Sequence, residues 1–303
     1  MNSVAAVVVT YNRLEELKKN IDMLLCQTRS LDAIYVINNA STDDTGIYLT
    51  ELAKKNKCIV HCCLEKNVGG AGGFAYGLER ACKDGYDWVW LMDDDGRPVN
   101  DETLEKLMEV AEKESNHSLI NCNVFWDGNE LSFKIGTPYN TLREQRENIA
   151  SGLIENCACV FNGSLVGRKV YESVGNIRKE YFIRGDEVEY LMRCKNNGVK
   201  VLTVIESLYY HPKTEYAHLS FLGKKFDYEC MAIWKQFFLI RNYVATYYTT
   251  ANEKQKKTMK RGLELIFLGS ILHDRSLKRL KYCIQAVRDG KKGIFDNHFR
   301  GVK

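Results

Sequence analysis

The first hundred residues alternate short runs of β-branched and apolar residues with stretches of helical periodicity. In the first such stretch, Leu14, Leu17, Ile21 and Leu24 fall on one helical face. Strands that alternate with helices form largely parallel sheets that the helices cover. We therefore expect an α/β fold with a parallel sheet flanked by helices. The strands are predicted at 4–10, 33–38, 58–63 and 88–92, and further helices near 45–55 and 71–83.

The second half of the chain has a different rhythm. Short strands are predicted near 119–125, 131–135 and 157–160, and we expect them to extend the same sheet. From Phe226 onward the pattern predicts helices, first an aromatic stretch and then two shorter basic ones. We therefore place a boundary near Leu222, with an α/β domain over 1–222 and a helical C-terminal extension over 223–303.

The composition is that of a soluble globular protein, because 45% of the 303 residues are apolar and 27% are charged. No apolar run approaches the roughly 20 residues needed to cross a bilayer, and no basic-then-apolar leader precedes Val4. We expect a cytoplasmic protein. The eleven cysteines are odd in number and lack C-x-x-C spacing. Cys62-Cys63 and Cys157-x-Cys159 lie in apolar, strand-like runs, so reduced core thiols are expected.

The C-terminal part is basic, whereas the chain as a whole is nearly balanced. From Ala251 to Lys303 there are 14 Lys and Arg against 5 Asp and Glu, compared with 43 against 39 overall. Such a surplus suits an anionic surface, whether membrane or nucleic acid, and a solvated helical face is the alternative. The aromatic residues between Trp234 and Tyr248 could instead pack against the α/β domain or a second subunit, which is the alternative to membrane contact.

The strand predicted at 88–92 runs directly into three carboxylates, Asp93, Asp94 and Asp95. Adjacent carboxylates repel one another, so a structure that keeps them together normally supplies a cation. An oxygen-rich cluster favours Mg²⁺ or Mn²⁺, ions that are often shared with substrate phosphates. The alternative is a polar turn, since Asp-Gly is a common turn pair.

Two other polar clusters, at 10–12 and 38–43, also follow predicted strands. Ligands of parallel α/β sheets bind at the carboxyl ends of the strands, so these clusters and the three carboxylates are expected to meet at one edge. The glycine-rich segment 67–74 precedes a helix and would let backbone N–H groups approach an anion. Its spacing fits neither a dinucleotide fingerprint nor a P-loop. A turn that permits tight packing of helix on strand is the alternative.

Four motifs follow one another along the chain: V-V-V-T-Y-N-R from Val7, N-N-A-S-T-D-D-T from Asn38, N-V-G-G-A-G-G from Asn67 and W-L-M-D-D-D from Trp90. Together they resemble the inverting family 2 glycosyltransferases, which have the Rossmann-like GT-A fold, an α/β fold with a mostly parallel mixed sheet flanked by helices. The resemblance covers roughly the first 215 residues and continues into 181–190 and 209–211. The Gly-rich form and the D-D-D triplet are most similar to the subgroup of galactofuranosyltransferases and rhamnosyltransferases.

The resemblance implies a nucleotide-sugar half at about 1–115 and an acceptor half at about 116–222. Within the first half, Asp43 would recognise the uracil or thymine edge. Asp93 and Asp95 match the D-x-D carboxylates that meet the diphosphate through Mn²⁺ or Mg²⁺, and His211 matches a metal-ligand histidine. The other nucleotide-sugar contacts that the resemblance implies are Thr10, Tyr11, Asn12, Asn39, Asn67, Gly70, Gly73 and Asp94.

The resemblance places the catalytic base in the segment 185–189. The aligned residue is Glu187, where the family usually has Asp, so the choice between Asp186 and Glu187 stays open. An alternative role exists for Asp186, as a helix N-cap with Glu189 closing a capping box.

The implied reaction is transfer of a sugar, with galactofuranose favoured, from a UDP- or dTDP-sugar to a hydroxyl group of a glycan or lipid-linked acceptor in cell-surface polysaccharide synthesis. Rhamnose transfer from dTDP-rhamnose is the alternative. The basic tail suggests a peripheral site on the inner membrane face, and a homo-oligomer is compatible with the aromatic stretch. A nucleic-acid partner is not expected. A sugar-nucleotide nucleotidyltransferase is a remoter alternative, although a basic residue in a glycine-rich loop would be expected where this chain has Thr10, Tyr11 and Asn12.

Overall fold

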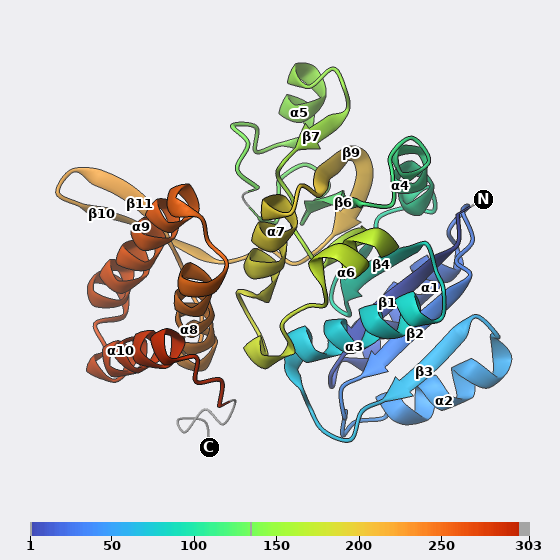
Figure 1. Ribbon diagram of the computed structural model, residues 1–303, viewed down its shortest axis with the longest axis horizontal. Coiled ribbons are helices and arrows are strands. Elements are labelled where there is room, and N and C mark those ends of the chain that lie inside the picture. Colours follow the sequence, from blue (N-terminus) through green and yellow to red (C-terminus); the bar gives the residue numbers. More distant parts are fainter. Residues whose placement is uncertain (1, 134, 297–303) are drawn as a thin grey trace. The chain divides into compact units, whose positions relative to one another are not determined.

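The computed structural model describes residues 2–133 and 135–296 (Figure 1). These residues form two compact units. The first, called here the sheet unit, takes the chain up to Lys179 together with Cys194–Lys213. The second, the helical unit, takes Glu180–Arg193 and the chain from Thr214 onward. Leu222 lies in the turn of a hairpin within the helical unit, and the predicted domain limits stay a prediction.

The sheet unit is built on one mixed sheet, which contains nine strands in the described part of the chain. Strands β3, β2, β1 and β4 run parallel to their neighbours, and β8 enters antiparallel between β4 and β6. The order is β3-β2-β1-β4-β8-β6-β9-β5, with β7 paired to β9. The bounds are β1 Val4–Thr10, β2 Ala33–Asn38, β3 Ile59–Cys63, β4 Trp88–Asp93, β5 Arg97–Pro98, β6 Ser118–Phe125, β7 Leu153–Glu155, β8 Asn162–Gly167 and β9 Lys200–Tyr210.

The helices of the first half cover this sheet as the periodicity predicts. Leu17, Ile21 and Leu24 of α1 are fully buried, and every residue of β1 is buried, as expected for a central parallel strand. The mostly parallel mixed sheet flanked by helices is therefore confirmed. The helices are α1 Leu14–Leu25, α2 Thr45–Lys55, α3 Gly69–Lys83, α4 Thr103–Ala111, α5 Leu142–Asn148 and α6 Arg168–Val174; η1 Lys179–Tyr181 follows, and α7 Asp186–Asn196 begins in the helical unit.

The helical unit contains a hairpin and three long helices. The hairpin pairs β10 (Tyr216–Phe221) with β11 (Lys224–Glu229). Its helices are α8 (Ile233–Thr249), α9 (Glu253–Gly269) and α10 (Leu277–Lys292), with the short π-helix η2 (Ser270–Asp274) after α9. Phe237 and Phe238 of α8 are buried in a core with Cys283 and Ala286 of α10. Part of the aromatic stretch is thus core of the helical unit, and packing against a second subunit stays a prediction.

Three predicted elements are wrong. Residues 157–160 are not a strand. Val160 and the next residue, Phe161, are buried, and Phe161 stacks on Phe74 with ring centroids 4.7 Å apart. The apolar character of this segment therefore reflects side-chain packing rather than pairing with another strand. In the predicted strand near 131–135, Leu131 forms only an isolated bridge to Phe125. Phe226 lies in β11 rather than in a helix, because the hairpin alternates its side chains with the period of a strand.

All eleven cysteines are free thiols, and Cys82, Cys122, Cys194 and Cys283 are buried. The others are half-buried or exposed, so the expectation of core thiols holds only for these four. None of the helices in the described residues is long and apolar enough to cross a membrane.

Candidate functional site

The polar clusters after β1, β2 and β4 meet at one edge of the sheet. Thr10 is in register with Asn38 at the ends of β1 and β2, and Val9 is in register with Asp93 at the end of β4. The predicted convergence of these clusters is confirmed. Because parallel strands expose their carboxyl ends at the same edge, this is where a ligand of an α/β sheet is expected.

Asp94 is the most buried of the three adjacent carboxylates, with 6% of its surface exposed. Its Oδ2 accepts a hydrogen bond from the Thr10 hydroxyl at 2.8 Å and another from the Tyr11 backbone N–H at 3.2 Å. Burial raises the pKa of Asp94 to about 6, although the Thr10 bond and the charge of Arg13 oppose the shift. The carboxylate therefore fastens the end of β4 to the end of β1.

Asp95 lies between two nitrogen groups. Arg13 Nη1 forms an ion pair with Asp95 Oδ2 and lies 3.5 Å from Asp94 Oδ1. On the other side, Asp95 Oδ1 is 3.6 Å from Nε2 of His211. The Nδ1 atom of His211 is 2.8 Å from the Pro212 carbonyl, which can only accept, so Nδ1 carries a proton. In the neutral imidazole this leaves the Nε2 lone pair on the side of Asp95.

The residue types at Asp95 and His211 fit a divalent ion, because a carboxylate oxygen and an imidazole nitrogen face each other and Nδ1 is held by a carbonyl in the manner of many metal-ligand histidines. A complete site is not assembled, since among residues 2–133 and 135–296 no three His, Cys, Asp or Glu side chains are grouped to hold a metal. A divalent ion at this cluster stays a prediction, and the chain itself supplies part of the positive charge. Arg13 already provides a cation to two of the three carboxylates.

Asn12 joins the first two clusters. Its backbone has φ 54°, in the left-handed region that Asn tolerates better than most residues. Its N–H donates to Ser41 Oγ at 3.1 Å, and its Oδ1 accepts from the Thr42 N–H at 2.7 Å. Asp43 is exposed, and its Oδ1 accepts from the Thr45 N–H at 3.1 Å at the start of α2. The loop that would meet a nucleotide base is thus ordered by its own hydrogen bonds.

Two amides shape the glycine-rich loop. Asn39 is buried; its amide donates to the Gly69 carbonyl at 3.1 Å and accepts from the Val68 N–H at 2.9 Å. Asn67 Oδ1 accepts from the Gly69 N–H at 2.8 Å. These contacts bring the loop to the sheet edge. Asn39 and Asn67 hold the loop, and direct contact of either with a nucleotide sugar stays a prediction.

The two glycines predicted to approach the donor differ. A Cβ on Gly70 would meet nothing within 4 Å, so this part of the loop is open. A Cβ on Gly73 would lie 2.5 Å from Val9 Cγ1, closer than real contacts allow. Gly73 therefore lets α3 lie directly on β1, which is the packing alternative, and its approach to a ligand stays a prediction.

The candidate bases belong to the helical unit, which is described on its own. Asp186 is the first residue of α7 and is 5% exposed, whereas Glu187 is half-buried. Burial raises the pKa of the Tyr243 hydroxyl to about 12, and the carboxylates of Glu187 and Glu229 add to the shift. Glu189 is bound by Arg193 Nη2 at 2.8 Å and by the Thr250 hydroxyl at 3.0 Å. Its role is therefore to fix α7.

Sequence reasoning missed three residues of the sheet edge. Arg13 belongs to the first motif. Its positive charge, at the sheet edge where three carboxylates are predicted, is the sequence signal that could have identified it. Asn20 of α1 donates to the carbonyls of Asp93 at 3.0 Å and Gly96 at 2.7 Å, so it fixes the turn that carries the carboxylates. Tyr209 is fully buried behind this turn; a Cβ on Gly96 would lie 2.5 Å from its ring. No sequence signal marks Asn20, and the resemblance reaches Tyr209 without giving it a role.

Known proteins resemble this chain in sequence or in fold. The chain is 37% identical over 216 residues to the galactofuranosyltransferase GlfT1 of Mycobacterium tuberculosis, covering 69% of this chain and 70% of that protein. It is 29% identical over 208 residues to the dTDP-rhamnosyl transferase RfbF of Shigella flexneri, covering 66% of each. The structure of GalNAc-T7 with UDP, GalNAc and Mn²⁺ superposes with a TM-score of 0.64 at 14% identity, covering 97% of this chain and 56% of that one.

The structural likeness establishes the GT-A fold, and the sequence relatives establish the family. The profile of Glycosyl transferase family 2 matches residues 5–175, which contain all three clusters at the sheet edge. The chain therefore belongs to glycosyl transferase family 2 and is a glycosyltransferase.

Proposed function

We propose that this enzyme transfers galactofuranose from UDP-galactofuranose to a hydroxyl group of a glycan or lipid-linked glycan, with inversion at the anomeric carbon. The observation that carries the reaction type is the arrangement of Asp95 between Arg13 and His211 at the carboxyl edge of the sheet. The identity of 37% to a galactofuranosyltransferase supports the choice of sugar. Family membership counts against both a nucleotidyltransferase and a nucleic-acid binder.

The residues divide the work as follows. The loop ordered by Asn12 and Thr42, with Asp43 beside it, would receive the base of the nucleotide. Asp93, Asp95 and His211 would hold Mn²⁺ or Mg²⁺, and a divalent ion there would supply Lewis-acid stabilisation of the leaving diphosphate. The open backbone at Gly70 would pass beside the diphosphate or the sugar. Arg13 is a further cation at this edge.

The acceptor hydroxyl must lose a proton as it attacks the anomeric carbon from the face opposite the diphosphate. We assign the removal of this proton to Glu187, with Asp186 as the second candidate. Glu187 is half-buried and Asp186 is almost fully buried, so Glu187 is the more accessible of the two to an acceptor. General-base catalysis of this kind typically contributes about 10²–10⁴-fold to the rate.

A donor screen tests the proposed function. We expect release of the nucleoside diphosphate to be fastest with UDP-galactofuranose. Release of UDP from UDP-galactose and UDP-glucose, and of dTDP from dTDP-rhamnose, should be weak, each measured with and without Mn²⁺. The likeness to a dTDP-rhamnosyl transferase makes rhamnose transfer the second candidate, and faster turnover of dTDP-rhamnose would favour it. Absence of turnover with all four donors would contradict both assignments.

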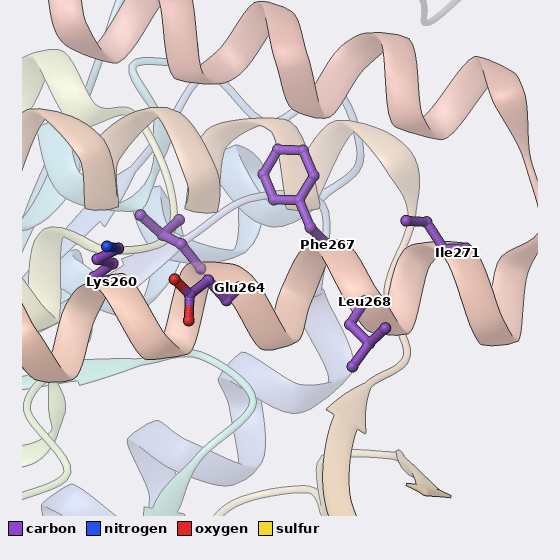
Figure 2. A pocket seen from close by; sticks show the side chains of 6 residues that line it. Lys260, Glu264, Phe267, Leu268 and Ile271 are labelled. Carbon is purple, nitrogen blue, oxygen red and sulfur yellow. The ribbon is translucent and has the colours of Figure 1, made fainter. Parts of the chain in front are cut away.

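A second proposal concerns the basic helices α9 and α10. Figure 2 shows a shallow hollow along α9 and η2 lined mostly by apolar side chains, with Lys260 and Glu264 toward one end. Ile271 and Leu277 are 52% and 85% exposed, and Lys256, Lys257 and Arg261 lie on the same helix as Lys260. Apolar side chains beside positive charge suit the surface of an anionic bilayer. We propose that the helical unit binds the inner membrane face, where lipid-linked acceptors are found.

Liposome binding tests this surface. We expect the enzyme to sediment with anionic vesicles at low salt and to be released as ionic strength rises, because screening weakens the attraction. Replacing Lys256, Lys257, Lys260 and Arg261 by Gln should abolish the binding without changing donor turnover in solution. If this variant binds as before, or if the wild type does not bind at low salt, the aromatic and basic residues serve packing or subunit contacts instead.

A further inference from the structure

The segment before the candidate bases has an unusual backbone. Phe182 and Arg184 have φ 67° and 64°, a region that non-glycine residues rarely adopt, and Gly185 follows with φ 84°. Such conformations cost free energy and persist only where the surroundings hold them. The next residues, Asp186 and Glu187, open α7. The shape of this loop therefore decides where both carboxylates lie.

Helix α8 holds the loop through one buried amide. The Nδ2 of Asn242 donates to the carbonyls of Tyr181 at 2.9 Å, Ile183 at 3.1 Å and Arg184 at 2.6 Å. Its Oδ1 accepts from Arg241 Nε at 3.0 Å, which turns the NH₂ side of the amide toward the loop. Asn242 is fully buried. Three carbonyls of a strained loop thus converge on a single side chain.

Neighbouring contacts reinforce this one. Arg241 is also fully buried, and its Nη2 donates to the Tyr181 carbonyl at 3.0 Å. Thr246, one turn further along α8, shares a hydrogen bond of 2.9 Å with the Tyr181 hydroxyl. Thr250, a further turn on, binds Glu189 at 3.0 Å. Positions 242, 246 and 250 lie four residues apart and share a helix face, so one polar stripe binds both the loop and α7.

Gly185 shows how closely the loop approaches α8. A Cβ at this position would lie 3.1 Å from Asn242 Cβ, and the positive φ would strain any other residue. All these residues belong to the helical unit, which joins Glu180–Arg193 to the chain from Thr214 onward. The C-terminal extension is therefore the support of the segment that carries the candidate bases.

We propose that Asn242, oriented by Arg241, is a positioning residue for the catalytic base: it fixes the loop 181–185 so that the carboxylate at the start of α7 meets the acceptor hydroxyl. This inference rests on the proposed role of Asp186 or Glu187. It predicts a loss of turnover with unchanged affinity for the sugar donor. The loop positions the carboxylate that removes the acceptor proton, whereas the nucleotide clusters lie elsewhere in the chain.

Two variants test it. Asn242→Ala removes the amide that donates to the loop carbonyls, and Gly185→Ala strains the last residue of the loop. Each variant should lower kcat at least tenfold while the Kd for UDP stays within twofold. Gln236→Ala is the matched control. Gln236 is a buried amide of the same helix, but it binds Ser270 at 2.7 Å and Arg279 rather than the loop. We expect this control to lower the melting temperature and to keep the wild-type kcat.

A double-mutant comparison separates positioning from general damage. In a background with Asp186→Asn and Glu187→Gln, adding Asn242→Ala should change the residual rate by less than twofold, since the group that it positions is gone. An equal loss in both backgrounds, or wild-type kcat in Asn242→Ala and Gly185→Ala, would overturn the inference alone. Full turnover in the background lacking both carboxylates would overturn the proposed base, and the inference with it.

Discussion

Asp95→Ala is expected to fold normally and to lose nearly all sugar transfer, by about 100-fold or more, as happens when one group that stabilises transition-state charge is removed. The side chain of Asp95 is 22% exposed and that of Arg13 is 46% exposed. Such ion pairs contribute about 0–1 kcal/mol to stability, so the free energy of unfolding should hardly change. Steady-state kinetics with Mn²⁺, together with thermal unfolding, measures both effects.

Asp94→Ala provides the contrast. Its carboxylate is buried and accepts from Thr10 and from the Tyr11 N–H, so its removal leaves buried donors unsatisfied. We expect a destabilisation of about 1–3 kcal/mol. The neighbouring aspartates should thus separate, with Asp94 affecting mainly folding and Asp95 mainly chemistry.

Chelation tests which cation stabilises the charge of the leaving diphosphate. If a metal does so, excess chelator should abolish wild-type activity, and Asp95→Ala should gain nothing from added Mn²⁺. Full activity of Asp95→Ala in excess chelator would reject the metal hypothesis. Arg13 would then be the cation, and Arg13→Ala should be the variant that loses turnover, because its guanidinium lies between Asp94 and Asp95.

The sequence predicts the first half of the fold well because local and global signals agree there. The strands β1, β2 and β4 are almost continuous apolar runs, buried on both faces, and α1 has a clear apolar face. The second half is harder. Phe161 is buried by a ring contact with Phe74, 87 positions earlier in the chain, and nothing in its neighbours distinguishes this burial from that of a strand.

The candidate site divides in the same way. Residues at strand ends, such as Thr10 and Asp94, can be brought together from the order of the strands alone. Partners that arrive from helices cannot. Asn20 binds carbonyls more than 70 positions away, and Asn242 binds a loop about 60 positions earlier. Amides of this kind are ordinary polar residues in the sequence, and their role depends on which buried carbonyls lack another donor.

Glu187→Gln should lower kcat by about 10²–10⁴-fold, the usual contribution of a general base, and leave the Kd for the donor nearly unchanged. A base removes the acceptor proton in the transition state, so its loss affects turnover rather than nucleotide binding. The substitution keeps the size of the side chain and its half-buried place in the first turn of α7. Turnover measured at saturating acceptor, with UDP affinity measured by calorimetry, separates the two quantities.

Asp186→Asn is the control, and we expect this variant to affect stability more than turnover. Asp186 is 5% exposed at the first position of α7, where a carboxylate is stabilised by the helix dipole. Asn keeps the shape but not the charge, so we expect a lower melting temperature and a kcat within about tenfold of the wild type. If Asp186→Asn abolishes turnover while Glu187→Gln retains it, the base is Asp186. The charge of Glu187, which adds to the effect of burial in raising the pKa of the Tyr243 hydroxyl, would then act only on the electrostatics of the helical unit.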